Sequence, residues 1–141
     1  MSTKYKLVVN EEDQIEILYD LLKQRTHGIS HSLMPGFREH TAFVKSKPYR
    51  AWYIVTNNNI PVGSFYITNE NVVGINIKDS LIEALLKNLM NYILEHYQPL
   101  TEIKSIRANR FICNISPKNV ILRKAFDRLN KDLLQLTYSF E

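Results

Sequence analysis

Hydrophobic and polar positions along the chain follow two periods, one typical of strands and one typical of helices. Apolar residues alternate with polar ones over short stretches, which favours strands, and recur every three to four residues over longer stretches, which favours helices. Stretches rich in asparagine, glycine or proline separate them and indicate turns. The pattern predicts strands over 5–10, 50–56, 61–68, 72–77, 105–114 and 133–140, and helices over 11–24, 35–45, 79–97 and 117–130.

The order of these segments predicts the fold class. It reads β-α-α-β-β-β-α-β-α-β, with asparagine-rich turns at 57–59 and 69–71. Short turns between the middle strands predict antiparallel hairpins, whereas helices between the later strands predict crossover connections. We therefore expect a single α/β domain over 1–141, with a mixed sheet covered by helices on both faces.

The segment 79–97 gives the strongest helical signal. Its apolar side chains form a wide stripe, which predicts burial in the core rather than a ligand site. Ser80 and Glu83 have the spacing of a capping box, so we expect the Ser80 side chain to cap this helix. Gly63 and Gly74 lie inside predicted strands and indicate bulges or the close approach of another group.

Composition narrows the class of protein. Of the 141 residues, 45% are hydrophobic and 23% are charged, which is typical of a globular domain. Cys113 is the only cysteine, so no internal disulfide can form and a reducing compartment is the simplest expectation. The first residues carry no long apolar core of a secretion signal, and no stretch reaches the roughly 18 apolar residues of a membrane span. We expect a cytoplasmic protein with no membrane partner.

Positive charge is concentrated in the second half of the chain. The net charge is +4, and eight basic residues lie between Lys104 and Lys131 against one acidic residue, Asp127. An anionic ligand or partner near this half is one interpretation, and a solvated helix face is the other. The chain shows no recognisable nucleic-acid module, such as paired aromatic motifs on a sheet, so nucleic acid ranks last among the partners.

Three groups of residues carry a family resemblance that extends over nearly the whole chain. Their order and spacing are more specific than any one of them. The first group is Ile29-Ser30-His31, Met34-Pro35, His40, Phe43-Val44, Pro48-Tyr49 and Trp52-Tyr53-Ile54; the second is Pro61 to Tyr66 with Val73 to Ile77; the third is Asn114 to Asn119 with Phe126 to Leu129. Together they resemble the GNAT acetyltransferase superfamily.

The resemblance implies a co-substrate and its place in the fold. In GNAT enzymes the strand that matches Gly74 to Ile77 separates from the next strand, here the segment 110–114, and the pantetheine arm of acetyl-CoA lies in the gap. The resemblance also implies a small-molecule amine as acceptor, an amino sugar being one example. The cofactor-binding residues would be Gly74, Ile75, Asn76, Ile77, Lys78 and Asn119. For Asn119, a cap at the start of the following helix is the alternative role.

The chain departs from the family at the loop that binds pyrophosphate. GNAT enzymes use a glycine-rich loop there, because glycine lets backbone N–H groups approach the anion. Only Lys78 and Asp79 separate the predicted strand from Ser80, and no glycine follows Gly74. Asp79 and Glu83 would repel phosphates, and Lys78 is the only local positive charge. The sequence therefore leaves open a helix that is simply well capped and binds nothing.

Two residues are candidates for proton transfer. His31 lies on what the resemblance makes the acceptor side and could take a proton from an amine, or it could be a hydrogen-bonded loop residue. Phe126 stands where many relatives carry a tyrosine that protonates the departing thiolate. Tyr138, in the last predicted strand, could replace that tyrosine or could serve packing alone. His27 and His31 have the spacing of helical metal ligands, but Gly28 argues against a helix, so we expect no metal.

Three functions remain open on this basis. The first is an N-acyltransferase that moves an acetyl group from acetyl-CoA to an amine of a small molecule. The second is a non-catalytic GNAT-like module that serves binding or oligomerisation. The third is a weak nucleic-acid binder that uses the basic second half. A homodimer is compatible with each of them.

Overall fold

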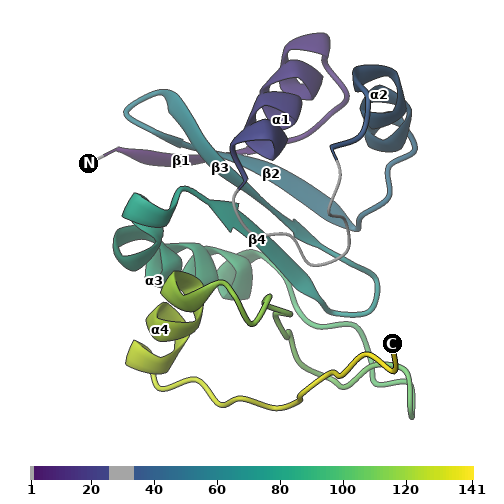
Figure 1. Ribbon diagram of the computed structural model, residues 1–141, viewed down its shortest axis with the longest axis vertical. Helices are drawn as coiled ribbons and strands as arrows, with labels where there is room; N and C mark the ends of the chain where they lie inside the picture. The colour runs from purple at the N-terminus through teal and green to yellow at the C-terminus, as the bar shows by residue number, and fades with distance from the viewer. Residues whose placement is uncertain (1, 26–33) are drawn as a thin grey trace.

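The computed structural model describes residues 2–25 and 34–141. These residues form one sheet with a pair of helices on each of its faces (Figure 1). The strands are β1 (Thr3–Leu7), β2 (Ala51–Asn57), β3 (Ile60–Ile67) and β4 (Val73–Ile77), and the helices are α1 (Glu12–Gln24), α2 (Phe37–Lys45), α3 (Asp79–His96) and α4 (Val120–Arg128). Helices α1 and α2 cover one face of the sheet, and α3 and α4 cover the other.

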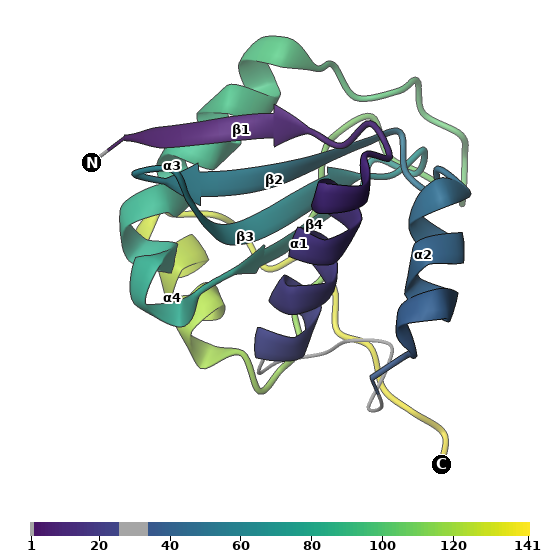
Figure 2. The same ribbon diagram turned by 90° about the horizontal axis from the view of Figure 1, so that it is seen from above.

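The sheet has the order β1-β2-β3-β4, and each neighbouring pair is antiparallel (Figure 2). The hairpin between β2 and β3 turns at Asn58 and Asn59, whose φ angles are 53° and 67°. Two consecutive positive φ angles give the turn that matches strand twist, and asparagine tolerates them. The predicted antiparallel meander and its asparagine turn are confirmed.

Alternation along β2 builds a core on each face of the sheet. Tyr53 and Val55 are buried with the side chains of α3 and α4, whereas Ile54 is buried with Ile15 of α1 and Val44 of α2. Successive strand residues point to opposite faces, so one strand supplies both layers. The wide apolar stripe of α3 is buried, as the sequence predicted. Its fully enclosed residues are Ile82, Leu85, Leu86, Leu89 and Ile93.

Two predicted strands are wrong. The described residues 105–114 make one parallel bridge, Val72 to Ile112, and otherwise no ladder with β4. Ser105 has a φ of 66°, which breaks an extended run at its start. Residues 133–140 pair with no described strand, although their apolar and polar residues alternate. A strand forms only where a neighbouring backbone supplies hydrogen bonds, and the pattern of side chains cannot show that.

The predicted capping box at the start of α3 is also wrong. The helix begins at Asp79, its N-cap is Lys78, and no side chain caps it. Glu83 forms an ion pair with Arg128 of α4 instead of turning back toward Ser80. Within the described part of the chain, no helix combines the length and the apolar character that crossing a membrane requires.

Candidate functional site

A gap opens along the outer edge of β4. The Val73 N–H donates to the Ile112 C=O over 2.7 Å, and the Ile112 N–H donates to the Asn71 C=O over 3.0 Å. After this contact, no described residue of the 109–114 segment bonds to the backbone of β4. The two stretches therefore meet once and then separate, which is the arrangement that the family resemblance implied.

The register of β4 shows which backbone groups face this gap. Lys78 donates its N–H to Val62 of β3 over 3.0 Å, and Asn76 lies opposite Ser64. Backbone groups alternate between the two sides of a strand, so those of Val73, Ile75 and Ile77 point to the outer edge. Val73 uses its N–H there on Ile112. Ile75 therefore presents a backbone donor and acceptor to the gap without a partner among the described residues.

Asn71 holds the point where the two stretches meet. Its side chain is 1% exposed, donates to the C=O of Leu100 and of Ala108 at 2.9 Å each, and accepts the Leu100 N–H at 2.8 Å. Its φ of 65° turns the chain into β4. The sequence indicated only a turn here, since a loop asparagine gives no sign that its amide is buried.

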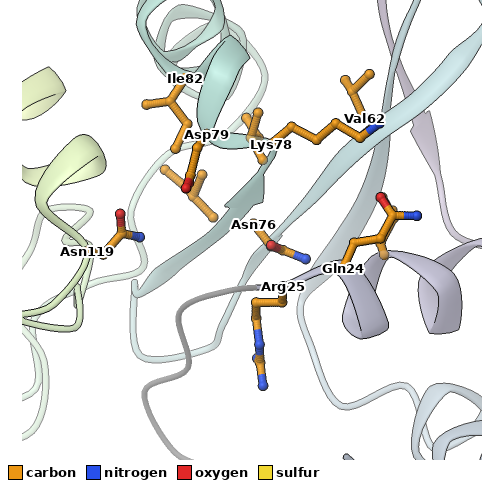
Figure 3. A pocket seen from close by; sticks show the side chains of 11 residues that line it. Gln24, Arg25, Val62, Asn76, Lys78, Asp79, Ile82 and Asn119 are labelled. Carbon is orange, nitrogen blue, oxygen red and sulfur yellow. The ribbon is translucent and has the colours of Figure 1, made fainter.

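A cavity of about 290 Å³ lies where the gap meets the start of α3 (Figure 3). It lies among five elements: the end of α1, β3, the end of β4, the start of α3 and the start of α4. Five of the six predicted cofactor-binding residues line it, and Gly74 does not. The lining residues are Leu21, Gln24, Arg25, Val62, Ile75, Asn76, Ile77, Lys78, Asp79, Ile82 and Asn119.

Two glycines let other groups approach β4 closely, as the sequence predicted. A Cβ on Gly74 would lie 2.1 Å from Cζ of Tyr66, so the tyrosine ring covers that glycine. A Cβ on Gly63 would lie 2.4 Å from the Asn76 backbone oxygen. Gly74 therefore makes room for a side chain on the α1 side, whereas Gly63 sets the spacing of β3 and β4 beside the cavity.

Charge at the cavity is mixed. Arg25, at the end of α1, and Lys78 supply positive charge, and the Asp79 carboxylate also lies on the lining. The N-cap residue Lys78 makes no side-chain cap, and the first turn of α3 adds the partial positive charge of a helix N-terminus. The sequence missed Arg25, because a helix end that lies far from β4 along the chain gives no local signal of its place in the fold.

Asn119 has two roles in this geometry. It is the N-cap of α4, where its Oδ1 accepts the Leu122 N–H at 3.2 Å, so the local cap that the sequence left open is confirmed. Its side chain also faces the cavity (Figure 3). The amide Nδ2 carries two donors that the cap does not use.

Several solved structures with a similar fold are named as acetyltransferases. One is a possible acetyltransferase from Clostridium difficile 630, with 14% identity and a TM-score of 0.58 over 100% of this chain and 98% of that chain. Another is the aminoglycoside N-acetyltransferase AAC(6')-Iy in complex with CoA, with 13% identity and a TM-score of 0.62 over 99% and 94%. A third is a Trypanosoma brucei acetyltransferase, with 13% identity and a TM-score of 0.58 over 99% of each chain. The chain has the GNAT acetyltransferase fold.

At identities this low the similarity establishes the GNAT fold but not the activity, which has to be argued from the residues of the site. No protein-family model matches the sequence, and no curated protein matches it either. The α/β fold class with helices on both faces of the sheet is confirmed. The sheet itself is antiparallel throughout instead of mixed, because the two late strands that were expected after crossover connections are irregular chain. The separation of β4 from the next segment, which the resemblance implied, is marked by one bridge instead of a second strand.

The two candidates for proton transfer stay predictions. His31 lies outside the described residues, as does His27. Tyr138 is 80% exposed and does not line the cavity. Phe126 is partly buried against the core and offers no proton. His40 of α2, another histidine of the family resemblance, is 6% exposed, and its Nε2 lies 3.2 Å from the Ile15 C=O.

The aromatic residues of the central hairpin pack mainly on one another. Tyr49 stacks on Tyr66 at 3.8 Å between ring centroids, and Trp52 meets Tyr49 edge to face. Burial raises the pKa of both Tyr49 and Tyr66, so neither phenol ionises near neutral pH. Burial likewise raises the pKa of Cys113 to about 12, so its thiol is not a ready nucleophile.

Several cations of the basic second half already have partners. Arg107 donates to the backbone oxygens of Thr101 and Asn69, and Arg128 pairs with Glu83. Arg107 thereby holds the irregular chain after α3, and Arg128 joins α4 to α3. These contacts leave open both the anionic ligand and the solvated helix face that the sequence offered for the basic second half. Among the described residues, no group of three His, Cys, Asp or Glu side chains is placed to hold a metal ion.

Proposed function

We propose that this chain is an N-acyltransferase that binds acetyl-CoA in the gap beside β4 and transfers its acetyl group to an amine of a small molecule. The observation that carries the proposal is the outer edge of Ile75 and Ile77, whose backbone groups have no partner among the described residues and lie next to a cavity that β4, α3 and α4 share. Solved structures of this fold include a complex of AAC(6')-Iy with a CoA-containing bisubstrate analogue, which supports a CoA ligand here.

Each part of the site would hold a different part of the co-substrate. The outward backbone groups of Ile75 and Ile77 suit the amides of a pantetheine arm, because they continue the hydrogen-bonding pattern of a strand edge. Lys78 and Arg25 suit its phosphates, helped by the uncapped start of α3. The free Nδ2 donors of Asn119 suit an acceptor oxygen. The residues present therefore fit the ligand, although Asp79 opposes its phosphates.

The thioester supplies an activated acyl group, so much of the rate can come from positioning. In the transfer, the amine nitrogen forms a C–N bond to the acetyl carbon and the C–S bond breaks. The amine proton passes to a base, and the thiolate takes a proton. His31 is the proposed base. Neither Phe126 nor the exposed Tyr138 gives this cavity a dedicated acid, so solvent is the expected proton source for the thiolate.

A thermal unfolding series with acetyl-CoA tests the proposal. A ligand at 100 times its dissociation constant adds about 2.7 kcal/mol of stability, which is readily measured. Lys78→Ala and Arg25→Ala should weaken the response, and Lys87→Ala, an exposed site on α3, serves as the matched control. An unchanged melting temperature at millimolar acetyl-CoA would contradict the proposal.

An unchanged melting temperature would favour a non-catalytic GNAT-like module. The specific observation on its side is Asp79, a carboxylate on the cavity lining where a phosphate group is expected, combined with a single residue between β4 and α3. An assay for free thiol released from acetyl-CoA in the presence of amines separates the two functions, because a module that binds acetyl-CoA without turnover releases none.

A further inference from the structure

The segment 133–140 exposes a row of large apolar side chains. Leu134, Leu136, Tyr138 and Phe140 alternate with polar residues, and their exposed fractions are 56, 67, 80 and 107%. This alternation is typical of a strand with one buried face. Among the described residues, however, the backbone of this segment has no strand partner, and in Figure 2 it projects from the rest of the molecule.

The same molecule also has an unfilled place for a strand. The segment 109–114 touches β4 only at Ile112, so its backbone is largely without a ladder among the described residues. Beside it lies a second cavity of about 780 Å³, whose apolar lining includes Phe111, Ile115 and Phe126. Only the first part of the 133–140 segment, up to Gln135, reaches this cavity.

We propose that two copies of this chain exchange these segments, so that residues 136–140 of each copy add as a strand beside 109–114 of the other and fill its second cavity. Exchange of an identical element between two copies is a low-cost route to a two-fold dimer. It satisfies the unpaired backbone of both segments and removes an exposed strand edge. The proposal is independent of the proposed function, since it uses neither the gap at Ile75 nor the first cavity.

The geometry at the end of α4 favours exchange over closure within one copy. Asn130 has a φ of 57°, and the Lys131 N–H bonds back to the Phe126 C=O at 3.1 Å. These features fix the direction in which the chain leaves α4. On this path the chain lines the second cavity only up to Gln135, and the residues after Gln135 do not line it. A second copy can receive them without any change at this turn.

The area involved is large enough for a stable dimer. An aromatic side chain buries about 150–250 Å², so two copies of Tyr138 and Phe140 remove roughly 600–1,000 Å² from water. The leucines of both segments and the paired backbones add to this. The total then reaches the range of about 1,200–2,000 Å² that is typical of stable interfaces.

Sedimentation equilibrium of the full chain tests the exchange. The chain should sediment at about twice its mass of 16.5 kDa. The double variant Leu136→Asp with Tyr138→Asp should raise the dimer dissociation constant at least 100-fold. The control Thr137→Asp with Ser139→Asp adds the same charge on the polar face of the segment, at exposed residues that do not line the second cavity, and should leave the dimer intact. A monomeric full chain, or equal behaviour of the two variants, would overturn the proposal.

Crosslinking distinguishes exchange from closure within one copy. Cys113 is the only native cysteine, and its buried thiol is a poor nucleophile, so the test uses a Cys113→Ser background. In this background Leu136→Cys adds one thiol on the segment proposed to move, and Asn114→Cys adds another at an exposed position of the 109–114 segment. A short bismaleimide should join the thiol introduced at position 136 of one copy to the thiol introduced at position 114 of the other and give a covalent dimer. The two variants that carry only one of these introduced thiols control for other links. A linkage within one chain, shown by the intact mass, would refute the exchange.

Discussion

The backbone N–H of Val73 donates to the backbone oxygen of Ile112 over 2.7 Å, and this bond is where β4 leaves its neighbour. A parallel pair that continued past this point would close the edge of β4. Because it stops here, the groups of Ile75 remain available to a ligand. The gap therefore depends on what holds Ile112 at the start of β4 and on what keeps the following residues away from it.

The first prediction concerns Asn71, whose buried amide holds this junction. Asn71→Ala removes three hydrogen bonds to Leu100 and Ala108, made by a residue that is 1% exposed. The loss of three hydrogen bonds and of a buried side chain should lower the free energy of unfolding by about 2–4 kcal/mol. Urea denaturation measures it. Asn69→Ala, at an exposed position in the same turn, should change it by less than about 0.5 kcal/mol.

The second prediction concerns the outward N–H of Ile75. Ile75→Pro removes this donor but no bond to β3, and proline is tolerated at a strand edge. We expect the affinity for acetyl-CoA to fall about 2- to 10-fold, the worth of one hydrogen bond. Ile75→Ala keeps the donor and removes the side chain, so it is the matched control. Calorimetric titration compares them, and equal affinities in the two variants would show that this N–H does not contact the ligand.

Most of the fold could be predicted from side-chain periodicity. The eight elements up to α4 have the predicted type and order, because each buries one face against a layer that the pattern anticipates. The failures at 105–114 and 133–140 share a cause. Alternation shows that a segment suits a strand, but it does not show whether another backbone lies beside it.

The candidate site was predicted in part. The resemblance placed Ile75 and Asn119 at a common cavity, and the structure brings them together there. It missed Arg25, which reaches the cavity only through the path of α1 over the sheet. It also gave α3 a capping box, because Ser80 and Glu83 have the right spacing, although Arg128 of α4 takes Glu83 as its partner. Tertiary contacts decided both points.

The third prediction concerns pH. Burial lowers the pKa of His40 below its usual 6.5, although the backbone oxygen of Ile15 acts against this shift. The unfolded chain therefore binds a proton at a higher pH than the folded chain. The contribution of His40 to stability is complete above pH 6.5 and is lost as pH falls through the lower folded pKa. Urea midpoints at pH 7.5 and 5.0 should differ less in His40→Gln than in the unsubstituted chain. An unchanged difference would show that other groups set this pH dependence.

The fourth prediction concerns Gly63, which lies opposite Ile77 in the ladder. An added Cβ would lie 2.4 Å from the Asn76 backbone oxygen and 2.8 Å from the Ile77 Cα. Backbone atoms cannot rotate away as a side chain can, so Gly63→Ala must force β3 and β4 apart. We expect a loss of about 3 kcal/mol and a melting temperature lower by roughly 10 °C.

Gly36→Ala is the control for that experiment. An added Cβ there meets nothing within 4 Å, and the φ of −68° suits alanine, so the cost should not exceed about 1 kcal/mol, that of alanine at a helix N-cap. Because Gly63 sets the position of Ile77, Gly63→Ala should also weaken acetyl-CoA binding at a temperature where the variant is still folded. Normal affinity together with lowered stability would mean that the spacing of β3 and β4 supports the sheet but not the cavity.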